Sequence, residues 1–250
     1  MFKNIFIFEI KYRIVRPATY VYLGIFFLLA FLGTVSDSIQ FGGPAGNTFR
    51  NSPIIIANIM GILTAFGMLV TSAIMSTPVY RDFEHNTHHL FFTLPMSKGS
   101  YLGGRFLGSF VITVLVFAGI PLGIMLGSFI GPMFGWIEPD KAGPFNLIAY
   151  VQPFVTLVIP NILFSGAIFF ALASLTRKIV YTYLGNVILL VIYIWGVDQL
   201  DNLDNKMLAS ILDPFALSTI GEITRYWTPA ESNVQLIPVT GLLLLNRVLW

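Results

Sequence analysis

Three histidines, His85, His88 and His89, lie close together beside Glu84 and are the residues of this chain best suited to metal chemistry. On a helix, His85 and His89 are four residues apart and face the same way, as paired zinc ligands do. Glu84 does not complete the HExxH spacing, however, and no fourth ligand is evident. We therefore interpret these side chains as a polar, solvated loop face, and we expect neither a metal site nor a cofactor.

The rest of the sequence offers no catalytic motif. It contains no HExxH, GxxxxGK[ST] or GxSxG pattern and no dinucleotide-binding fingerprint. It also contains no cysteine, which excludes disulfides and thiolate metal sites. The net charge is only +2 and the basic residues are scattered, so we expect no nucleic-acid partner. This segment is not expected to be an enzyme.

The composition indicates that the lipid bilayer surrounds the elements that carry these residues. Of 250 residues, 56% are hydrophobic and 10% are charged, whereas soluble domains carry about 25% charged residues. Apolar runs of about 17–25 residues are long enough to cross a bilayer as helices. We predict an all-α polytopic membrane protein with a transmembrane domain over residues 17–197, containing spans at 18–35, 54–77, 107–130, 152–176 and 179–197.

Two segments flank the predicted domain. Residues 1–16 place Glu9, Arg13 and Arg16 on one stripe, which favours an interfacial helix with Lys and Arg facing head groups; a cleaved signal peptide is the alternative. Residues 198–245 are more polar, and we expect an extracytoplasmic loop with short helices. Residues 246–250 would then begin a sixth span that is cut off at Trp250.

Lys and Arg are more frequent on one side of the predicted spans. With the N-terminus inside, most of them fall in inside segments, so the positive-inside rule predicts a cytoplasmic N-terminus. The loop over residues 80–106 would then also be cytoplasmic. The five predicted spans contain no Asp, Glu, Lys, Arg or His. Ion-coupled carriers generally need ionisable groups at membrane depth, so energy is expected to arrive through the cytoplasmic loop.

Glycines in the third predicted span recur every fourth residue, at Gly119, Gly123 and Gly127. Such a ridge allows another helix to approach closely. We expect it to serve helix packing within the chain, with a dimer interface or a substrate pathway as alternatives. Pro121 and Pro160 are either hinges or ordinary kinks of membrane helices.

The loop carries a family resemblance. Arg81–Glu84, Leu94–Ser97 and Tyr101–Phe106 resemble the loop of ABC-2-type ABC transporter permeases, in which an RD pair leaves the second span. A narrower resemblance covers most of the chain. It links Arg81–Thr93 and a set of later residues to the N-terminal permease region of bacterial permease and M1-type zinc aminopeptidase fusion proteins. The later residues are 213–215, 224–228, Glu231, Asn233, Pro238 and 246–250.

The resemblance implies a permease half in the bacterial inner membrane, paired as a homodimer or heterodimer and driven by a separate cytoplasmic ABC ATPase subunit. Six spans per half are implied, but this sequence lacks the sixth span and any peptidase motif. Arg81 and Asp82 would orient the loop by local ion pairing, or simply form an exposed charge pair. The ATPase-docking residues would be Arg81, Asp82, Glu84, His85, His88, Leu90, Phe91 and Phe92.

Two alternatives to a permease remain from the sequence. The chain could be the membrane anchor of an attached M1-type aminopeptidase, with no transport activity of its own. It could also be a channel or an ion-coupled carrier, although the absence of charge in the predicted spans argues against the carrier. The apolar spans would suit lipids, hydrophobic peptides or no substrate.

Overall fold

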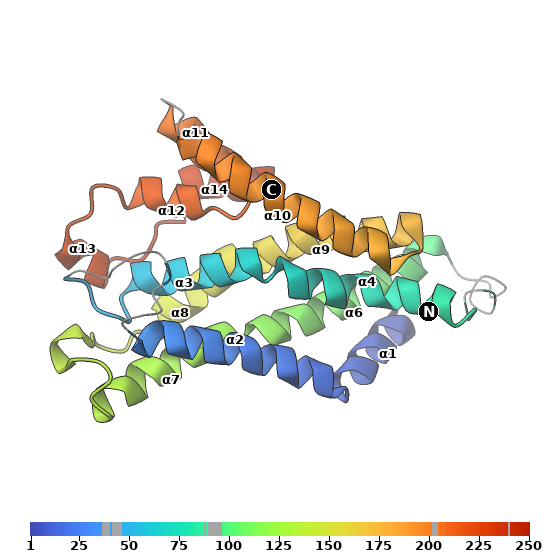
Figure 1. Ribbon diagram of the computed structural model, residues 1–250, viewed down its shortest axis with the longest axis horizontal. Coiled ribbons are helices and arrows are strands. Elements are labelled where there is room, and N and C mark those ends of the chain that lie inside the picture. Colours follow the sequence, from blue (N-terminus) through green and yellow to red (C-terminus); the bar gives the residue numbers. More distant parts are fainter. Residues whose placement is uncertain (37–40, 42–46, 88, 90–96, 202–204, 240) are drawn as a thin grey trace. The chain divides into compact units, whose positions relative to one another are not determined.

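A computed structural model describes the chain except for residues 37–40, 42–46, 88, 90–96, 202–204 and 240. Every regular element in the described part is helical, with no β-strand (Figure 1). The helices are α1 (Phe2–Ile14), α2 (Pro17–Val35), α3 (Pro53–Phe66), α4 (Met68–Glu84), α6 (Lys98–Phe117), α7 (Gly119–Met133), η1 (Pro139–Lys141), α8 (Leu147–Pro153), η2 (Phe154–Val158), α9 (Ile159–Thr176), α10 (Ile179–Asp201), α11 (Lys206–Leu212), α12 (Leu217–Ile223), α13 (Pro229–Val234) and α14 (Leu242–Leu249).

The chain forms two compact units, and several helices contribute to both. Unit 1 comprises residues 1–22, 67–116 and 162–193, and unit 2 comprises residues 23–66, 117–161 and 194–250. The core of unit 1 includes Met75, Val79 and Phe170, with Phe106 packed edge-on against Phe170. The core of unit 2 includes Ala57, Leu157 and Ile220.

The long helices are apolar enough to cross a membrane. By length and composition, four described helical stretches qualify: Pro17–Val35, Lys98–Met133, Leu147–Thr176 and Ile179–Gln199. A fifth is added if α3 and α4 count as one span. Many of their apolar side chains are exposed. In the most apolar part of Ile179–Gln199, only 11% of the residues are buried inside the protein. Such surfaces are stable in lipid rather than in water, so the chain is an all-α membrane protein.

The second predicted span differs most from the structure. Residues 54–77 were expected to form one span, but the helix is interrupted at Gly67, and α4 continues past residue 77, through Pro78, to Glu84. Lys98–Phe106 are likewise the first turns of α6. The predicted loop over residues 80–106 is therefore helical at both ends, up to Glu84 and from Lys98 onward. As a result, the helices do contain ionisable residues, including Arg81, Asp82 and Arg105.

The fourth predicted span, residues 152–176, is divided into three helical segments near its prolines, which the sequence did not predict. Pro153 ends α8, Pro160 lies near the start of α9, and a π-helical turn, η2, separates the two. A proline removes one backbone donor and leaves a carbonyl without its usual partner. Thr156 donates its hydroxyl to the carbonyl oxygen of Gln152 at 2.9 Å, which adds a side-chain hydrogen bond to this region. Residues 147–176 remain one helical stretch despite the two prolines.

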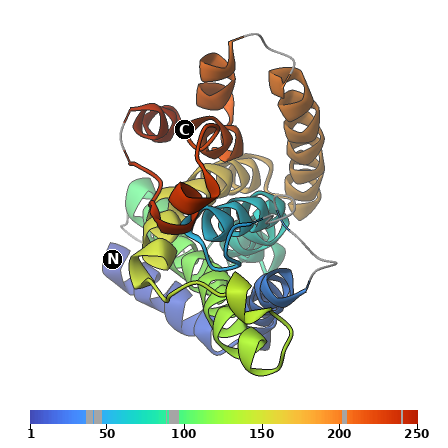
Figure 2. The ribbon, with the colours of Figure 1, turned by 90° about the vertical axis from the view of Figure 1, so that its left-hand side faces the viewer.

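The polar C-terminal segment of unit 2 folds into short helices. Helices α11, α12 and α14 pack on one another (Figures 1 and 2). Helices α11 and α12 agree with the short helices expected within residues 198–245. Helix α14 begins at Leu242, earlier than the predicted start of a sixth span at residue 246, and spans eight residues.

Candidate functional site

Three helices of unit 1 bring charged side chains into one buried cluster. Glu9 lies on α1, Arg81 and Asp82 lie near the end of α4, and Arg105 lies on α6. Glu9 is 0% exposed, Arg105 is 1% exposed and Asp82 is 3% exposed. Charged side chains are rarely buried this completely unless they are paired. We refer to Glu9, Arg13, Arg81, Asp82, Tyr101 and Arg105 as the charged junction.

Arg105 connects the two acids of the charged junction. One terminal nitrogen, Nη1, donates to Glu9 Oε1, and the other, Nη2, donates to Asp82 Oδ1 at 2.9 Å and Oδ2 at 2.7 Å. The planar guanidinium suits such forked contacts with carboxylates. The hydroxyl of Tyr101 also donates to Asp82 Oδ2 at 2.5 Å. A single residue of α6 therefore ties α1 to α4.

Two further arginines surround Glu9. Arg13 lies one turn after Glu9 on α1 and donates through Nε to Oε2 at 3.1 Å. Arg81 donates through Nη2 to Oε1 at 2.6 Å, and its guanidinium lies 4.1 Å from the ring centroid of Tyr12. This cation–π contact is a further interaction that holds the C-terminal end of α4 against α1. Arg81 and Asp82 thus pair with different helices instead of with each other, which corrects the predicted local ion pair.

The charged junction holds more positive than negative charge. Its three arginines face two carboxylates, a formal excess of one positive charge. Burial alone would raise the pKa of Glu9, but attraction to Arg13, Arg81 and Arg105 outweighs burial and holds that pKa below its usual 4.5. Burial lowers the pKa of Arg13, although a guanidinium stays protonated at neutral pH. Glu9 is therefore ionised, and its negative charge offsets part of the positive charge of the three arginines around it.

Glycines on α6 allow α1 to come close enough for these ion pairs. A Cβ at Gly104 would lie 3.2 Å from the carbonyl oxygen of Phe2, and one at Gly108 would lie 2.6 Å from the Cβ of Glu9. Any larger residue at Gly108 would push Glu9 away from Arg105. The predicted interfacial helix therefore packs on α6 along one side. Glu9 and Arg13 face this protein interior, which corrects the expectation that Arg13 faces head groups.

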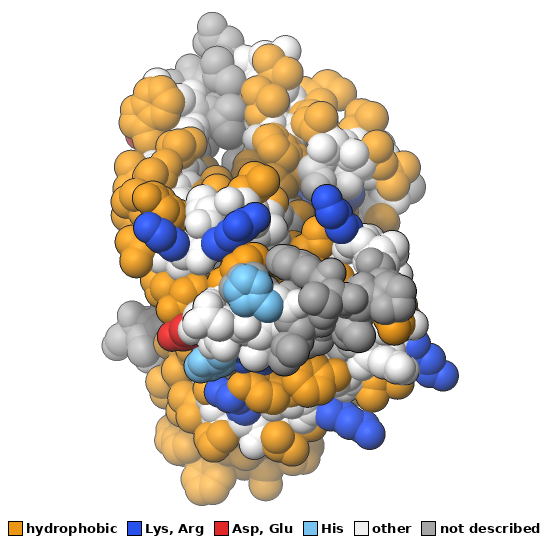
Figure 3. All heavy atoms as spheres, turned by 90° about the vertical axis from the view of Figure 1, so that its right-hand side faces the viewer, with side chains coloured by type: hydrophobic (Ala, Val, Ile, Leu, Met, Phe, Trp, Pro, Cys, Tyr) orange, Lys and Arg blue, Asp and Glu red, His pale blue; other side chains and the backbone are white. Residues whose placement is uncertain are grey.

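Exposed basic residues mark the outer surface of unit 1. Figure 3 shows Lys and Arg side chains with histidines on one face. The exposed basic side chains of unit 1 are Lys3, Lys11, Arg16, Lys98, Arg177 and Lys178. Glu84 is the exposed acid among the described residues of this unit. Buried charges are thus paired inside, while the solvent-facing charge is mostly positive.

The predicted docking residues fall into three groups. Glu84 and His85 are exposed, so a partner could contact them. Asp82 is buried and Arg81 is half-buried, so both can act on a partner only by positioning the helix. His88, Leu90, Phe91 and Phe92 lie outside the described residues. In the described part of the chain no three His, Asp or Glu side chains form a group that could hold a metal ion.

The glycine ridge lies in unit 2 and packs against α2. A Cβ at Gly119 would lie 2.5 Å from the carbonyl oxygen of Leu23, and one at Gly123 would overlap the carbonyl oxygen of Phe27. A Cβ at Gly127 would lie 3.1 Å from the Cβ of Thr34. The three glycines therefore contact a helix of the same chain, and we refer to this contact as the glycine seam.

A second polar cluster in unit 2 was not foreseen from the sequence. Asn246 on α14 is fully buried and donates to the carbonyl oxygens of Ser210, Ile211 and Asp213 at 2.8 to 3.1 Å. Arg247 donates to Asn161 Oδ1 at 2.8 Å. Asn246 and Arg247 belong to the outer-loop run noted in the sequence, but their partners lie more than thirty positions away. Only the fold brings them together.

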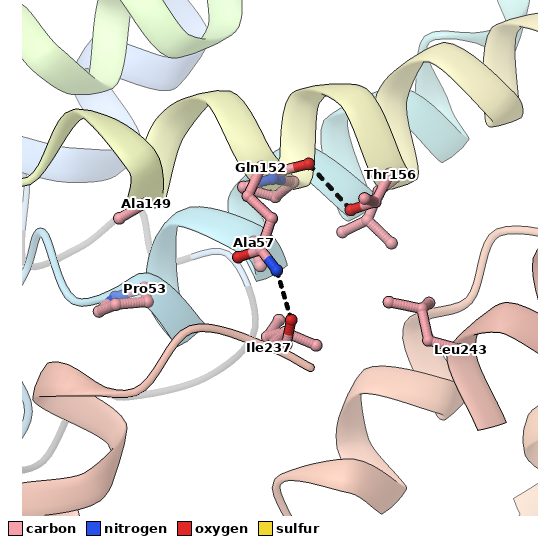
Figure 4. A pocket seen from close by; sticks show the side chains of 9 residues that line it. Pro53, Ala57, Ala149, Gln152, Thr156, Ile237 and Leu243 are labelled. Atoms are coloured by element: carbon pink, nitrogen blue, oxygen red, sulfur yellow. Dashed lines mark hydrogen bonds between the residues drawn. The ribbon is translucent and has the colours of Figure 1, made fainter. Parts of the chain in front are cut away.

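Gln152 lines a small cavity in unit 2 and donates to the carbonyl oxygen of Ile237 at 2.5 Å (Figure 4). The cavity has a volume of about 10 Å³, and its other lining residues include Ala57, Thr156 and Leu243. A volume of this size holds about one water molecule. It is a packing feature and is too small for a substrate.

The charged junction is therefore the described site at which buried ion pairs join α1, α4 and α6. In comparisons with known proteins, no family model, no curated protein and no solved structure matches this chain.

Proposed function

We propose that this chain is the membrane-spanning permease part of an ABC-2-type exporter, driven by a separate cytoplasmic ATPase. The observation that supports this proposal best is the charged junction. Arg81, Asp82, Tyr101 and Arg105 all belong to the motifs that resemble the ABC-2 loop. Arg81 and Arg105 pair with Glu9 of α1, and Arg105 and Tyr101 hold Asp82. Residues that carry the resemblance thus share one physical task.

That task is to join the two ends of the loop. Residues 85–97 connect α4 to α6, and Arg105 of α6 holds α4 through Asp82 and α1 through Glu9. A force applied to the loop would move the ends of α4 and α6 together, with α1 following through Glu9. Breaking buried ion pairs is costly, so the three helices would respond as one lever.

The exposed charges support a cytoplasmic location for this face. The exposed basic side chains of unit 1 greatly outnumber its exposed acids among the described residues. Loops rich in Lys and Arg stay on the cytoplasmic side of the membrane. We place the N-terminus in the cytoplasm of a bacterial cell and the chain in its inner membrane, as one half of a homodimeric or heterodimeric permease.

Docking by an ATPase can be tested at the two exposed loop residues. The tagged chain is cross-linked in its native membrane with and without ATP, and captured proteins are screened for an ATP-binding cassette and for ATP hydrolysis. The purified ATPase is then titrated against wild type and against the double variant Glu84→Ala and His85→Ala. We expect the double variant to weaken binding at least tenfold, because interface side chains of this kind contribute more than about 1.4 kcal/mol when they are central.

The matched control is Glu138→Ala, an exposed carboxylate in unit 2 that pairs with Lys141. It should leave ATPase binding unchanged, since its loop is expected on the opposite side of the membrane. If no ATPase binds the wild-type chain in any nucleotide state, the transport proposal fails and the membrane anchor of an attached enzyme becomes the better hypothesis.

A further inference from the structure

A strip of neutral polar side chains joins α4 to α10 within unit 1. We refer to Ser72 and Ser76 on α4 and Thr182 and Asn186 on α10 as the polar strip, and each of these residues is at most 1% exposed. Thr182 and Asn186 lie in the stretch Ile179–Gln199, which is long and apolar enough to cross a membrane. The polar strip is therefore shielded from solvent inside a membrane-spanning part of the chain.

One hydrogen bond sets the register of the two helices in the polar strip. Asn186 donates through Nδ2 to Ser72 Oγ at 2.9 Å, and Ser72 donates its own hydroxyl to the carbonyl oxygen of Leu69 at 2.8 Å. Helices α4 and α10 run in opposite directions (Figure 1). Ser76 lies four residues after Ser72, and Thr182 lies four residues before Asn186. Both hydroxyls are therefore one helical turn beyond this bond on the same side of it.

Three oxygen atoms of the polar strip have no hydrogen-bond partner in the described part of the chain. They are Ser76 Oγ, Thr182 Oγ1 and Asn186 Oδ1, and all three atoms are buried. A buried polar atom without a partner destabilises the folded state, so such atoms in native proteins are usually bonded to ordered water. Because these three lie on two facing turns of α4 and α10, a single ligand can reach all of them.

The chemistry of the three atoms matches a water molecule. The amide oxygen of Asn186 can only accept a hydrogen bond, whereas the hydroxyls of Ser76 and Thr182 can donate or accept. Water donates two hydrogen bonds and accepts two, so it can donate to Asn186 and also bond both hydroxyls. One helical turn rises about 5.4 Å, close to the distance that one water bridges with two hydrogen bonds. All members of the polar strip are neutral, so they offer no counter-charge to a buried cation.

We infer that a water molecule binds between α4 and α10, held by Ser76, Thr182 and Asn186. The water adds a second polar link to the bond between Asn186 and Ser72. Helices in lipid are held together by such hydrogen bonds and by close packing, since they gain little from the hydrophobic effect. The inference goes beyond the proposed transport function, because it requires neither an ATPase nor a transported substrate.

Water at this position can be detected directly in the wild-type chain. The full chain with isotope-labelled threonine is placed in lipid bilayers, and magnetisation transfer from water to the threonine side chains is followed by solid-state NMR. The variants Thr182→Val and Thr113→Val identify the two signals to be compared. Thr113 is the internal reference, because it is also 0% exposed but donates its hydroxyl to the carbonyl oxygen of Ser109 at 2.9 Å. We expect transfer to Thr182 to be several times faster than to Thr113.

Substitutions test whether the hydroxyls share one water molecule. Thr182→Val and Ser76→Ala each remove one of its partners, so each should lower the midpoint of thermal unfolding in detergent by roughly 2–4 °C. The double variant should unfold close to the less stable single variant, since the second substitution acts on a water that is already lost. Without a bound water the sign would be opposite, because removing an unpaired buried hydroxyl stabilises a protein.

Thr113→Val is the matched control for the substitutions, and its effect should add to that of Ser76→Ala because the two hydroxyls share no partner. The inference is overturned if transfer from water to Thr182 is no faster than to Thr113. It is equally overturned if Thr182→Val and Ser76→Ala leave the midpoint unchanged, raise it or have additive effects. A wild-type midpoint that rises with sodium chloride but not with choline chloride, and no longer does so in Thr182→Val, would indicate a bound cation and would also overturn it.

Discussion

The charged junction of unit 1 and the glycine seam of unit 2 hold helices together by opposite means. In the charged junction, long side chains from α1, α4 and α6 meet through buried ion pairs. In the glycine seam, the glycines of α7 carry no side chain, so α7 comes close to the backbone of α2 at Leu23 and Phe27. Helices in lipid gain little from the hydrophobic effect, so polar contacts and close packing must replace it.

The difference teaches which contact can pass a displacement from one helix to the next. Buried ion pairs link α1, α4 and α6 and are costly to break, so moving one of these helices would carry the others along. A glycine seam depends on shape alone, and separating its helices loses van der Waals contacts without any new partner. We therefore expect movement, where it occurs, to use the charged junction. Three substitutions or conditions test this comparison.

Removing the central arginine should have the largest effect. Arg105→Ala leaves Glu9 and Asp82 buried with fewer cations, and breaking a buried ion pair in this way costs about 3–5 kcal/mol. We expect a large drop in the midpoint of thermal unfolding in detergent. Arg225→Gln, at an exposed pair, should change the midpoint little. Equal midpoints for Arg105→Ala and wild type would show that the charged junction does not stabilise unit 1.

Adding one methyl group to the glycine seam should have a smaller effect. Gly123→Ala places a Cβ where the carbonyl oxygen of Phe27 lies, so α2 and α7 must separate, at a cost of about 1–3 kcal/mol. Gly24→Ala on α2 is the matched control, because a Cβ there meets nothing within 4 Å. It should be neutral or stabilise by up to about 1 kcal/mol through helix propensity. The two unfolding midpoints should move apart, and a shared shift would argue against close packing at Gly123.

Acid should weaken the charged junction and leave the glycine seam unchanged. The pKa of Glu9 is lower in the folded protein than its usual 4.5, so its stabilisation is fully present above pH 4.5 and is lost as pH falls through the lowered pKa. At neutral pH no change is expected. Thermal unfolding measured from pH 7 to pH 3 should show a loss in wild type at the acid end. Glu9→Gln should lose less stability between pH 7 and pH 3, because it has no carboxylate to protonate at this position. Identical pH profiles for Glu9→Gln and wild type would contradict a stabilising role of ionised Glu9.

The sequence by itself determined the class of this protein. Its apolar runs are long enough to span a bilayer, and its low charge excludes a soluble fold. The glycines at every fourth residue identified one flat helix face, because a period of four follows a helix closely. The motifs around Arg81 and Arg105 also marked the segment that turned out to hold the charged junction.

Only the tertiary structure decided how those residues are paired. Glu9 and Arg105 are 96 positions apart in the chain, and no local pattern links them. The stripe of Glu9 and Arg13 on α1 fits a membrane surface and a protein interior equally well, since amphipathicity does not say what covers the polar face. Gly67 was one glycine among 22 until the structure placed it at the interruption between α3 and α4. Helix faces follow from local periodicity, whereas partners follow from contacts that are distant in sequence.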